Sequence, residues 1–247
     1  MDRSQDDVSK PAAATVSYHE HVAVPDYLMR HYWWAYVHPK APRVFDRLWL
    51  INLILLCNYN RMRRTALAEF DAPELGRILQ VACVYGNLTP KLAKRAALQA
   101  GELDVIDVLP IQLRTLKWKL PKRTPVRLMR MDSTALHLDD AQYDKVLLFF
   151  LLHEQPVDVR ARTISEALRV LKPDGTLVIC DYGTPAWWNP LRYLMPPFLA
   201  LLEPFALSLM RRPVKDLLPP DMTVRHTPFF GGFYQKVVAT RSGSATD

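Results

Sequence analysis

The pattern of apolar and polar positions along the chain changes at Arg77. From there on, short apolar runs alternate with stretches of helical periodicity, which is typical of βαβ units in a parallel sheet. We expect five parallel strands, at 78–83, 103–106, 126–131, 145–151 and 176–180, with helices between them at 89–98, 111–120 and 157–171. Two further runs, 224–229 and 234–240, lie on either side of Gly231 and Gly232 and predict a closing antiparallel pair. The pattern therefore predicts an α/β domain.

The N-terminal region has a different pattern. Residues 1–24 are expected to be disordered, because the start of the chain is acidic and polar. Residues 25–38 are dense in aromatic side chains, and 44–64 predicts one helix with an apolar body and a basic end. Cations at the carboxyl end of a helix are electrostatically favourable. We therefore expect a helical, aromatic cap at 25–70, followed by the α/β domain at 71–247.

A second apolar segment, 187–220, lies between the fifth strand and the closing pair. Prolines interrupt it, and basic residues edge it: Arg192, Arg211, Arg212 and Lys215. This composition is unlike that of a sheet element, so we expect a lid inserted at 185–220. Residues 172–175, Lys-Pro-Asp-Gly, are expected to form a turn before the fifth strand.

Charge and composition narrow the class of protein. The 247 residues carry a formal net charge of +7, which suits either anionic lipid or nucleic acid as a partner. The sequence has no zinc finger, RNA-recognition signature or basic zipper, so we expect no nucleic-acid partner. Its most apolar run, 48–57, is shorter than the ~20 residues of a spanning helix, so we expect no transmembrane segment. The three cysteines, Cys57, Cys83 and Cys180, show neither metal-ligand spacing nor a disulfide framework, which fits a reducing compartment.

Polar residues follow the first three expected strands. The loop 80–89 keeps only Gly86 of the three glycines of a dinucleotide motif, so an ordinary βα turn is an equal interpretation. Asp107 ends the second strand, where a carboxylate can accept hydrogen bonds from both ribose hydroxyls of a nucleoside. Asp132 and Ser133 end the third strand, where a carboxylate can accept a bond from an adenine amino group. Each residue alone is more often a helix cap or a turn residue, but the order of the three loops favours a nucleoside site.

These loops, with Tyr143-Asp144-Lys145-Val146 and the segment 167–175, resemble class I S-adenosylmethionine (SAM)-dependent methyltransferases over 77–240. Four segments resemble more closely the RquA family of rhodoquinone biosynthesis enzymes: YLMRHYWWAY at 27–36, VACVYG at 81–86, FFLLHEQP at 149–156 and FFGGFYQK at 229–236. This second resemblance covers nearly the whole chain after Val24. It implies a Rossmann-like class I methyltransferase fold, with a mainly parallel sheet, a C-terminal antiparallel hairpin, N-terminal helices and a lid after the fifth strand.

The resemblance also implies an activity. Enzymes of this family replace a methoxy group of ubiquinone with an amino group taken from SAM, and they require manganese. The positions that match the SAM-binding loops are Gln80, Ala82, Val84, Tyr85, Gly86, Asp107, Val108, Asp132 and Ser133.

The first of these loops departs from the ordinary methyltransferase pattern, which has an acidic residue at the position of Gln80 and glycines at those of Ala82 and Val84. That carboxylate pairs with the ammonium group of SAM, and Gln80 cannot do so. Loss of a close opposite charge lowers the pKa of an amine, typically by about 1–3 units. A neutral amine is a nucleophile, whereas an ammonium group is not. We therefore expect Gln80, Val84 and Tyr85 to reposition the SAM amino group and to leave it less charged.

Manganese prefers carboxylates, imidazole and water as ligands. His153 and Glu154 follow the fourth strand and Asp181 follows the fifth, and the ends of neighbouring parallel strands meet at one edge of a sheet. We expect these three residues to bind the ion, which would act as a Lewis acid on the quinone oxygens. The expected catalytic residues are Tyr85, His153 and Asp181.

Other interpretations of these residues remain open. His153 and Glu154 are also suited to cap or orient the next helix, and Asp181 to turn the chain. His137 and Asp139 form another possible metal-binding pair, in an expected surface turn.

The aromatic segments 27–36 and 187–210 are typical either of a core or of a surface that meets a bilayer, where Trp and Tyr are enriched. Basic residues beside apolar cover segments suit binding to anionic lipid. We therefore expect a cytoplasmic enzyme that is bound peripherally to the inner membrane. The resemblance to the RquA family implies ubiquinone as its substrate and anaerobic respiration as its setting.

Two alternatives remain for the function. A conventional SAM-dependent quinone methyltransferase is disfavoured by the missing acid at Gln80. A non-catalytic SAM- or lipid-binding assembly factor is disfavoured by the polar residues that are retained after the strands. The sequence does not indicate an oligomeric state.

Overall fold

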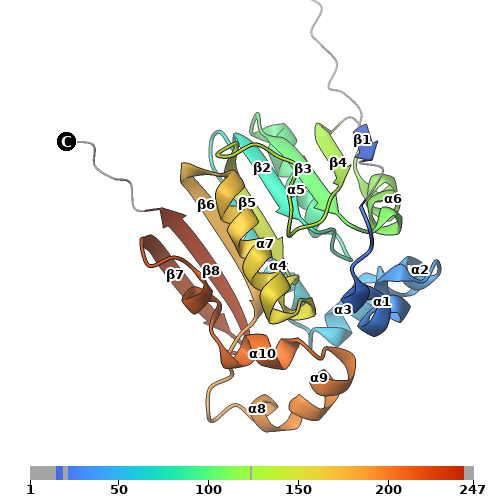
Figure 1. Cartoon of the computed structure of the whole chain (residues 1–247), viewed down its shortest axis with the longest axis vertical. Coiled ribbons are helices and arrows are strands. Elements are labelled where there is room, and N and C mark those ends of the chain that lie inside the picture. The colour runs from blue at the N-terminus through green and yellow to red at the C-terminus, as the bar shows by residue number, and fades with distance from the viewer. Residues whose placement is uncertain (1–14, 19–21, 123, 242–247) are drawn as a thin grey trace, which may run out of the picture.

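The computed structural model contains one eight-stranded β-sheet. The structure describes residues 15–18, 22–122 and 124–241. The described strands lie in the order β1-β4-β3-β2-β5-β6-β8-β7 (Figure 1). Their bounds are β1 Thr15–Tyr18, β2 Arg77–Val81, β3 Glu102–Asp107, β4 Val126–Arg130, β5 Tyr143–Phe149, β6 Leu171–Tyr182, β7 Met222–Phe229 and β8 Tyr234–Arg241. The first six strands in this order run parallel to one another, whereas β8 is antiparallel to both β6 and β7.

The central strands are apolar on both faces because helices cover both sides of the sheet. Successive residues of a strand point to opposite faces, so Ile78 of β2 joins one core and Leu79 the other. Helices α4 (Tyr59–Leu67), α5 (Leu88–Leu98) and α6 (Pro110–Lys119) pack in the first core, and α7 (Val157–Val170) packs in the second.

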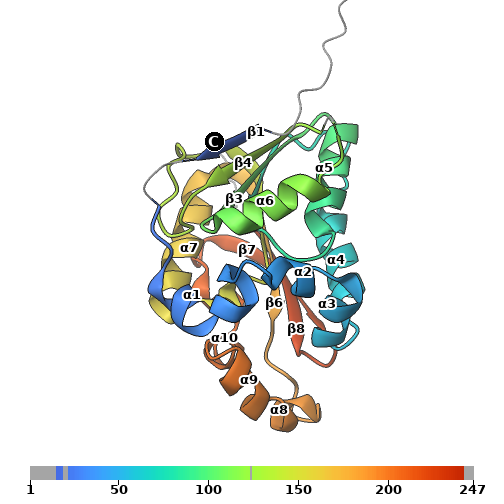
Figure 2. The ribbon, with the colours of Figure 1, turned by 90° about the vertical axis from the view of Figure 1, so that its right-hand side faces the viewer.

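Two helical segments lie beyond the carboxyl ends of the parallel strands (Figures 1 and 2). The N-terminal cap comprises α1 (Asp26–His31), a π-helical turn (Trp33–Val37), α2 (Ala41–Phe45) and α3 (Leu48–Ile54). The lid comprises α8 (Leu191–Leu194), α9 (Pro196–Leu202), α10 (Ala206–Arg211) and a 3-10 turn (Val214–Leu217). Further 3-10 turns occur at Ala68–Phe70 and Leu152–Glu154.

The expected α/β fold is confirmed. Strands and helices from β2 to α7 end within two residues of the expected bounds, and the closing pair forms as predicted. Residues 172–175, expected to form a turn, instead lie within β6, where they form a bulge in its pairing with β5. Tyr143 pairs with Leu171 but Lys145 pairs with Thr176, so the intervening residues bulge out and Lys172 contacts Asp144.

The single helix expected at 44–64 is wrong. Helix α3 ends at Ile54 and α4 begins at Tyr59, and Leu56 and Cys57 between them have positive φ angles of 48° and 64°. The reason is the environment of the two halves. α3 exposes most of its apolar side chains, whereas α4 must bury Tyr59 against the sheet, and one straight helix cannot satisfy both.

The expected disordered segment 1–24 falls mostly outside the described residues. Thr15–Tyr18 differs from the expectation, because it forms the edge strand β1 beside β4. Among the described helices, none combines the length and apolarity needed to cross a bilayer.

Candidate functional site

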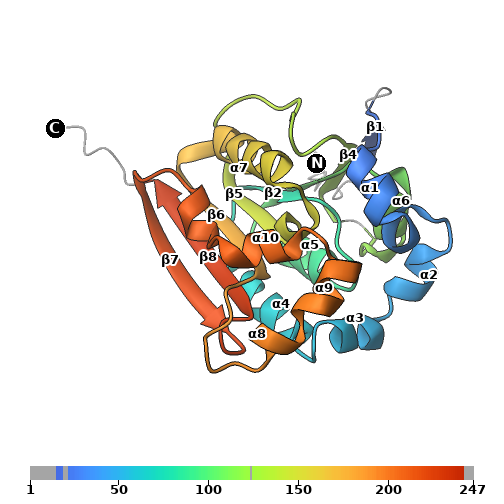
Figure 3. The ribbon, with the colours of Figure 1, turned by 60° about the horizontal axis from the view of Figure 1, so that its bottom comes forward.

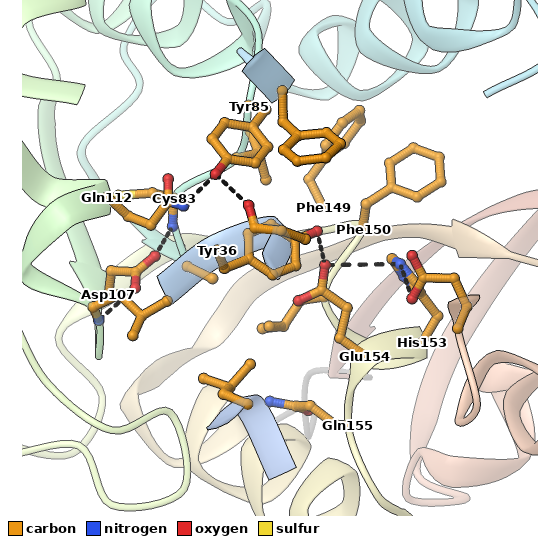
Figure 4. Close-up of a pocket in the computed structure, with 18 of the residues that line it drawn as sticks. Tyr36, Cys83, Tyr85, Asp107, Gln112, Phe149, Phe150, His153, Glu154 and Gln155 are labelled. Carbon is orange, nitrogen blue, oxygen red and sulfur yellow. Dashed lines mark hydrogen bonds and ion pairs between the residues drawn. The ribbon is translucent and has the colours of Figure 1, made fainter. Parts of the chain in front are cut away.

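A cavity of about 530 Å³ opens beyond the carboxyl ends of the central strands. Three parts of the chain build its wall: the loops after the strands, the N-terminal cap and the lid (Figure 4). Nine of the expected site residues line it: Ala82, Val84, Tyr85, Asp107, Val108, Asp132, Ser133, His153 and Glu154. Gln80, Gly86 and Asp181 do not.

Asp107 ties the first two loops together at one side of the cavity. Its Oδ2 accepts a hydrogen bond from the backbone N–H of Cys83 (2.7 Å), and its Oδ1 accepts one from Leu109 (2.8 Å). Burial raises the pKa of Asp107 to about 6, against the effect of these hydrogen bonds. The carboxylate is thus fixed in place where β3 ends, as expected for a residue that accepts bonds from ribose hydroxyls.

Asp132 and Ser133 also line the cavity, and both serve the local fold. The Oδ1 of Asp132 accepts bonds from the backbone N–H (2.8 Å) and the hydroxyl (2.9 Å) of Thr134. This is the turn geometry that the sequence left open as an alternative. Ser133 Oγ lies 2.9 Å from the hydroxyl of Thr163 and accepts a bond from Gln155 Nε2 (3.1 Å).

Gln80 lies beneath the first loop and is fully buried. Its Nε2 donates to the carbonyl of Ala82 (2.9 Å), and its Oε1 is buried without a hydrogen-bond partner. Ala82 has a φ of +69°, a left-handed conformation that costs a non-glycine residue about 1–2 kcal/mol. The loop therefore takes a backbone shape that glycine favours, although alanine occupies the position.

Gly86, which is expected to bind SAM, does not line the cavity, and its backbone contacts another part of the chain. Its φ is +90°, and a Cβ there would clash with the hydroxyl of Tyr59. Its N–H donates to Asp46 Oδ1 (2.7 Å), while the next residue, Asn87, donates its N–H to Tyr59 (2.8 Å). Gly86 thus allows α4 to pack closely on the first loop.

Tyr85 fastens the cap to the first loop. Its ring stacks on Tyr36, with centroids 5.5 Å apart, and on Phe45, at 6.3 Å. Its hydroxyl donates to the carbonyl of Ala35 (2.7 Å) and accepts from Gln112 Nε2 (2.9 Å). These contacts let Tyr85 hold the cap against the first loop at the wall of the cavity, and its expected catalytic role stays a prediction.

His153 and Asp181 form a buried ion pair at the other side of the cavity. His153 Nδ1 lies 2.8 Å from Asp181 Oδ1, and this carboxylate also accepts backbone bonds from Leu152 (2.8 Å), His153 (3.3 Å) and Tyr182 (2.7 Å). Burial by itself lowers the pKa of His153, but the charge and hydrogen bond of Asp181 raise it to about 9. The pairing with Asp181 therefore favours the imidazolium form of the ring.

Two further carboxyl groups face this imidazolium. The Nε2 of His153 lies 3.8 Å from Glu154 Oε1 (Figure 4). The same atom lies 3.9 Å from Glu203 Oε2. Tyr36 of the cap donates its hydroxyl to Glu154. Burial raises the pKa of both glutamates, while the charge of His153 acts against this. The cap, the lid and the end of the sheet therefore meet around the imidazole ring of His153.

The metal site expected at His153, Glu154 and Asp181 is not formed. Both oxygens of Asp181 are filled by N–H donors of the chain, so this carboxylate orients His153 and the following turn. Within the described part of the chain, no group of three or more His, Cys, Asp or Glu side chains is placed to hold a metal ion. His137 and Asp139 lie on the surface, outside the cavity.

The sequence analysis missed Glu203 and the polar contacts of Tyr36 and Gln112. A signal for Glu203 was present, because it and Asp216 are the only acidic residues between 187 and 220. A lone carboxylate in an apolar segment is seldom buried without a partner. The partner of Glu203 lies 50 residues earlier in the chain, and no local pattern indicates it.

Parts of the sequence are similar to known methyltransferases. Residues 78–175 match the family described as "Methyltransferase domain". The chain is 32% identical over 147 residues to a demethylmenaquinone methyltransferase of Clavibacter sepedonicus, which covers 59% of this chain and 56% of that protein. It is 29% identical over 112 residues to a ubiquinone/menaquinone biosynthesis C-methyltransferase, UbiE, of Idiomarina loihiensis, covering 44% and 43%. The chain thus spans only about half the length of these curated relatives.

A solved structure shows the same fold. The PH0226 protein from Pyrococcus horikoshii OT3 superposes with a TM-score of 0.56 and 15% identity, over 89% of this chain and all of that one. The described chain therefore has a Rossmann-like class I methyltransferase fold, and the sequence matches support the superfamily of class I SAM-dependent methyltransferases.

Proposed function

We propose that the chain is a SAM-dependent transferase that acts on a quinone ring and replaces a methoxy group of ubiquinone with the amino group of SAM. One observation carries the proposal: a single cavity has a fixed carboxylate, Asp107, at one side and an imidazolium, His153, at the other. Cavities of roughly 300–1,000 Å³ accommodate ligands of drug size. The cavity thus has room for the reacting parts of both substrates.

The first side suits SAM. Asp107 is held by backbone donors at the end of β3, where an acceptor meets ribose hydroxyls in folds of this type. Gln80 lies beneath the first loop, outside the cavity wall, and its buried Oε1 has no partner within the described chain. A neutral amide there adds no negative charge close to the SAM amino group, whereas a carboxylate would. This side of the cavity therefore suits SAM whose amine is held less strongly in its charged form.

The second side suits a quinone. His153 can donate from Nε2 to a ring carbonyl and draw electron density from the neighbouring carbon. Attack by the SAM amine forms the carbon–nitrogen bond and expels the methoxy group, which leaves as methanol with a proton of the amine. The nitrogen stays on the quinone when the SAM-derived chain is eliminated. The N–Cα and Cβ–H bonds of this chain break, the nitrogen keeps the electron pair of the N–Cα bond and takes up a proton, and the carbon skeleton leaves as an alkene. The aromatic wall of Phe150, Tyr182 and Tyr36 offers flat surfaces to the ring.

Conventional methylation of a quinone is the second candidate, because the relatives are named for it. It would use the same cavity and the same His153. The residue that separates the two reactions is Gln80, where a carboxylate would hold the SAM ammonium charged.

The proposal extends to the location of the protein. Trp33 and Trp34 of the cap and Trp187 and Trp188 before α8 are exposed, which suits peripheral binding to an anionic inner membrane in an organism that respires anaerobically. The manganese requirement rests on the family resemblance alone, and we assign it no ligands on this chain.

Isotope labels decide between the two reactions. With SAM labelled at the amino nitrogen and a short-tailed ubiquinone, mass spectrometry should find the label in the quinone product. Label on the methyl carbon of SAM should not appear in the quinone product. The amino product should disappear when manganese is removed by chelation and return when the ion is restored. Methyl label in the quinone, with S-adenosylhomocysteine released, would establish methylation instead.

Gln80→Glu should suppress amination at neutral pH, because a carboxylate stabilises the ammonium form of SAM. A stabilised ammonium loses its proton only at higher pH, so raising the pH should partly restore the rate. The uncharged variant Gln80→Leu serves as control for the buried position and should keep the wild-type pH profile. An unchanged rate and profile in a folded Gln80→Glu protein would remove this electrostatic role.

SAM affinity should depend on pH through Asp107. Its pKa is raised to about 6, so the carboxylate is present above this pH and protonated below it. We expect calorimetric affinity for SAM to fall as the pH drops through this value. Asp107→Asn should weaken SAM binding by about ten- to a hundredfold, the value of a charged hydrogen bond, and should abolish this pH dependence. Equal affinity in both proteins at neutral pH would exclude Asp107 from the site.

Asp181→Asn should lower the pKa of His153, because burial then acts without the opposing negative charge. A close opposite charge is worth about 1–3 pKa units, and an NMR titration of the imidazole measures the change directly. If the imidazolium polarises the quinone, the alkaline limit of the rate must move down with this pKa while SAM affinity stays the same. A lower pKa with an unmoved rate profile would mean that the charge of His153 serves stability only.

A further inference from the structure

We infer that the cavity opens through a port between α3 and α9 that faces lipid, and that the apolar tail of the substrate enters there while this face rests on an anionic bilayer. The inference rests on the proposed quinone substrate. It adds the face of the protein that contacts the membrane and the route that the tail takes.

The port is defined by side chains that line the cavity and are also largely exposed. Four apolar residues meet both conditions: Trp34 (44% exposed), Ile54 (50%), Phe198 (61%) and Leu202 (48%). Trp34 and Ile54 belong to the cap, whereas Phe198 and Leu202 belong to α9. A residue that touches both the cavity and solvent lies at an opening, so we place the opening between these two segments. Figure 3 shows where α3 and α9 lie in the fold.

The surface around the port is apolar as well. Trp49 (63% exposed) and Leu53 (60%) extend it along α3, and Leu194 (61%) and Leu201 (80%) extend it along α8 and α9. Single exposed apolar side chains are common on soluble proteins, but a continuous group of them marks an interaction surface. Here the group surrounds the entrance of the candidate site.

The cavity changes from polar to apolar between its floor and its port. Asp107, His153 and Glu154 lie at the strand ends, whereas the port is formed by aromatic and aliphatic side chains. A molecule with a polar ring and an apolar tail satisfies both ends. A wholly polar substrate would leave the port without a partner and exposed to water.

The charges beside the port favour anionic lipid over a second copy of the chain. From 40 to 54 and from 187 to 202, the exposed charged residues are Lys40, Arg43, Arg47 and Arg192. The acid in these stretches, Asp46, is partly buried and bonded to Lys119. Two copies meeting through this face would bring like charges together, whereas anionic headgroups would pair with them.

Vesicle flotation tests the surface without any turnover. Wild-type protein should float with vesicles that contain phosphatidylglycerol, and much less with phosphatidylcholine alone or at high salt. The double variant Leu53→Asp/Leu201→Asp should lose about tenfold or more of this binding, because charged side chains are costly at a lipid interface. Leu98→Asp is the matched control and should float like the wild type, because Leu98 is 75% exposed at the opposite edge of the sheet, where α5 ends. Equal flotation of all three proteins would overturn the inference.

Photo-crosslinking tests the route of the tail. A ubiquinone analogue with a diazirine on its tail should label peptides of α3 and α9, with label competed away by unmodified quinone. Label confined to other elements would overturn the route. Mass photometry of the wild type and the double variant identifies the other occupant, since a dimer that the two aspartates dissociate would make this face a subunit interface. If flotation and crosslinking give the expected results but no amino product forms, the proposed reaction is wrong and the inferred port is still supported.

Discussion

The buried ion pair between His153 and Asp181 fixes the polar end of the cavity. Asp181 accepts hydrogen bonds from the imidazole and from three backbone N–H groups, so neither the carboxylate nor the ring can rotate freely. The charged ring in turn gives Glu154 and Glu203 a cation to face. Two buried carboxyl groups would otherwise have no compensation for their lost hydration. The rest of the site is arranged around this pair.

Three distant segments depend on that arrangement. Tyr36 brings the cap to Glu154, Glu203 brings the lid to His153, and Tyr85 holds the cap against the first loop. The sheet alone supplies only the floor of the cavity. Its walls form where polar groups on the cap and the lid find partners at the strand ends.

The sequence predicts the sheet well because each buried strand leaves a local apolar pattern, and the loops after β3 and β4 are found by their position at strand ends. It places Gln80, Tyr85 and Asp181 near the strand ends but does not predict which groups their side chains contact. The type of a residue does not reveal whether its polar atoms already have hydrogen-bond partners. The carboxylate of Asp181 accepts hydrogen bonds from two segments of the chain. Glu203 meets His153 only in three dimensions. The break between α3 and α4 was missed because both halves are apolar, and only burial separates them.

That break also divides the chain into parts that are free to change independently. The turn at Leu56 and Cys57 disconnects the exposed helix α3 from α4, whose Tyr59 is fixed in the core beneath Gly86. Substitutions at the exposed positions of α3, such as Trp49 and Leu53, alter the outer surface without disturbing the packing of the sheet, whereas Ile51 of the same helix is buried in the first core. Descendants of one ancestral sequence could therefore adapt this seven-residue helix to new surroundings while inheriting the interior unchanged.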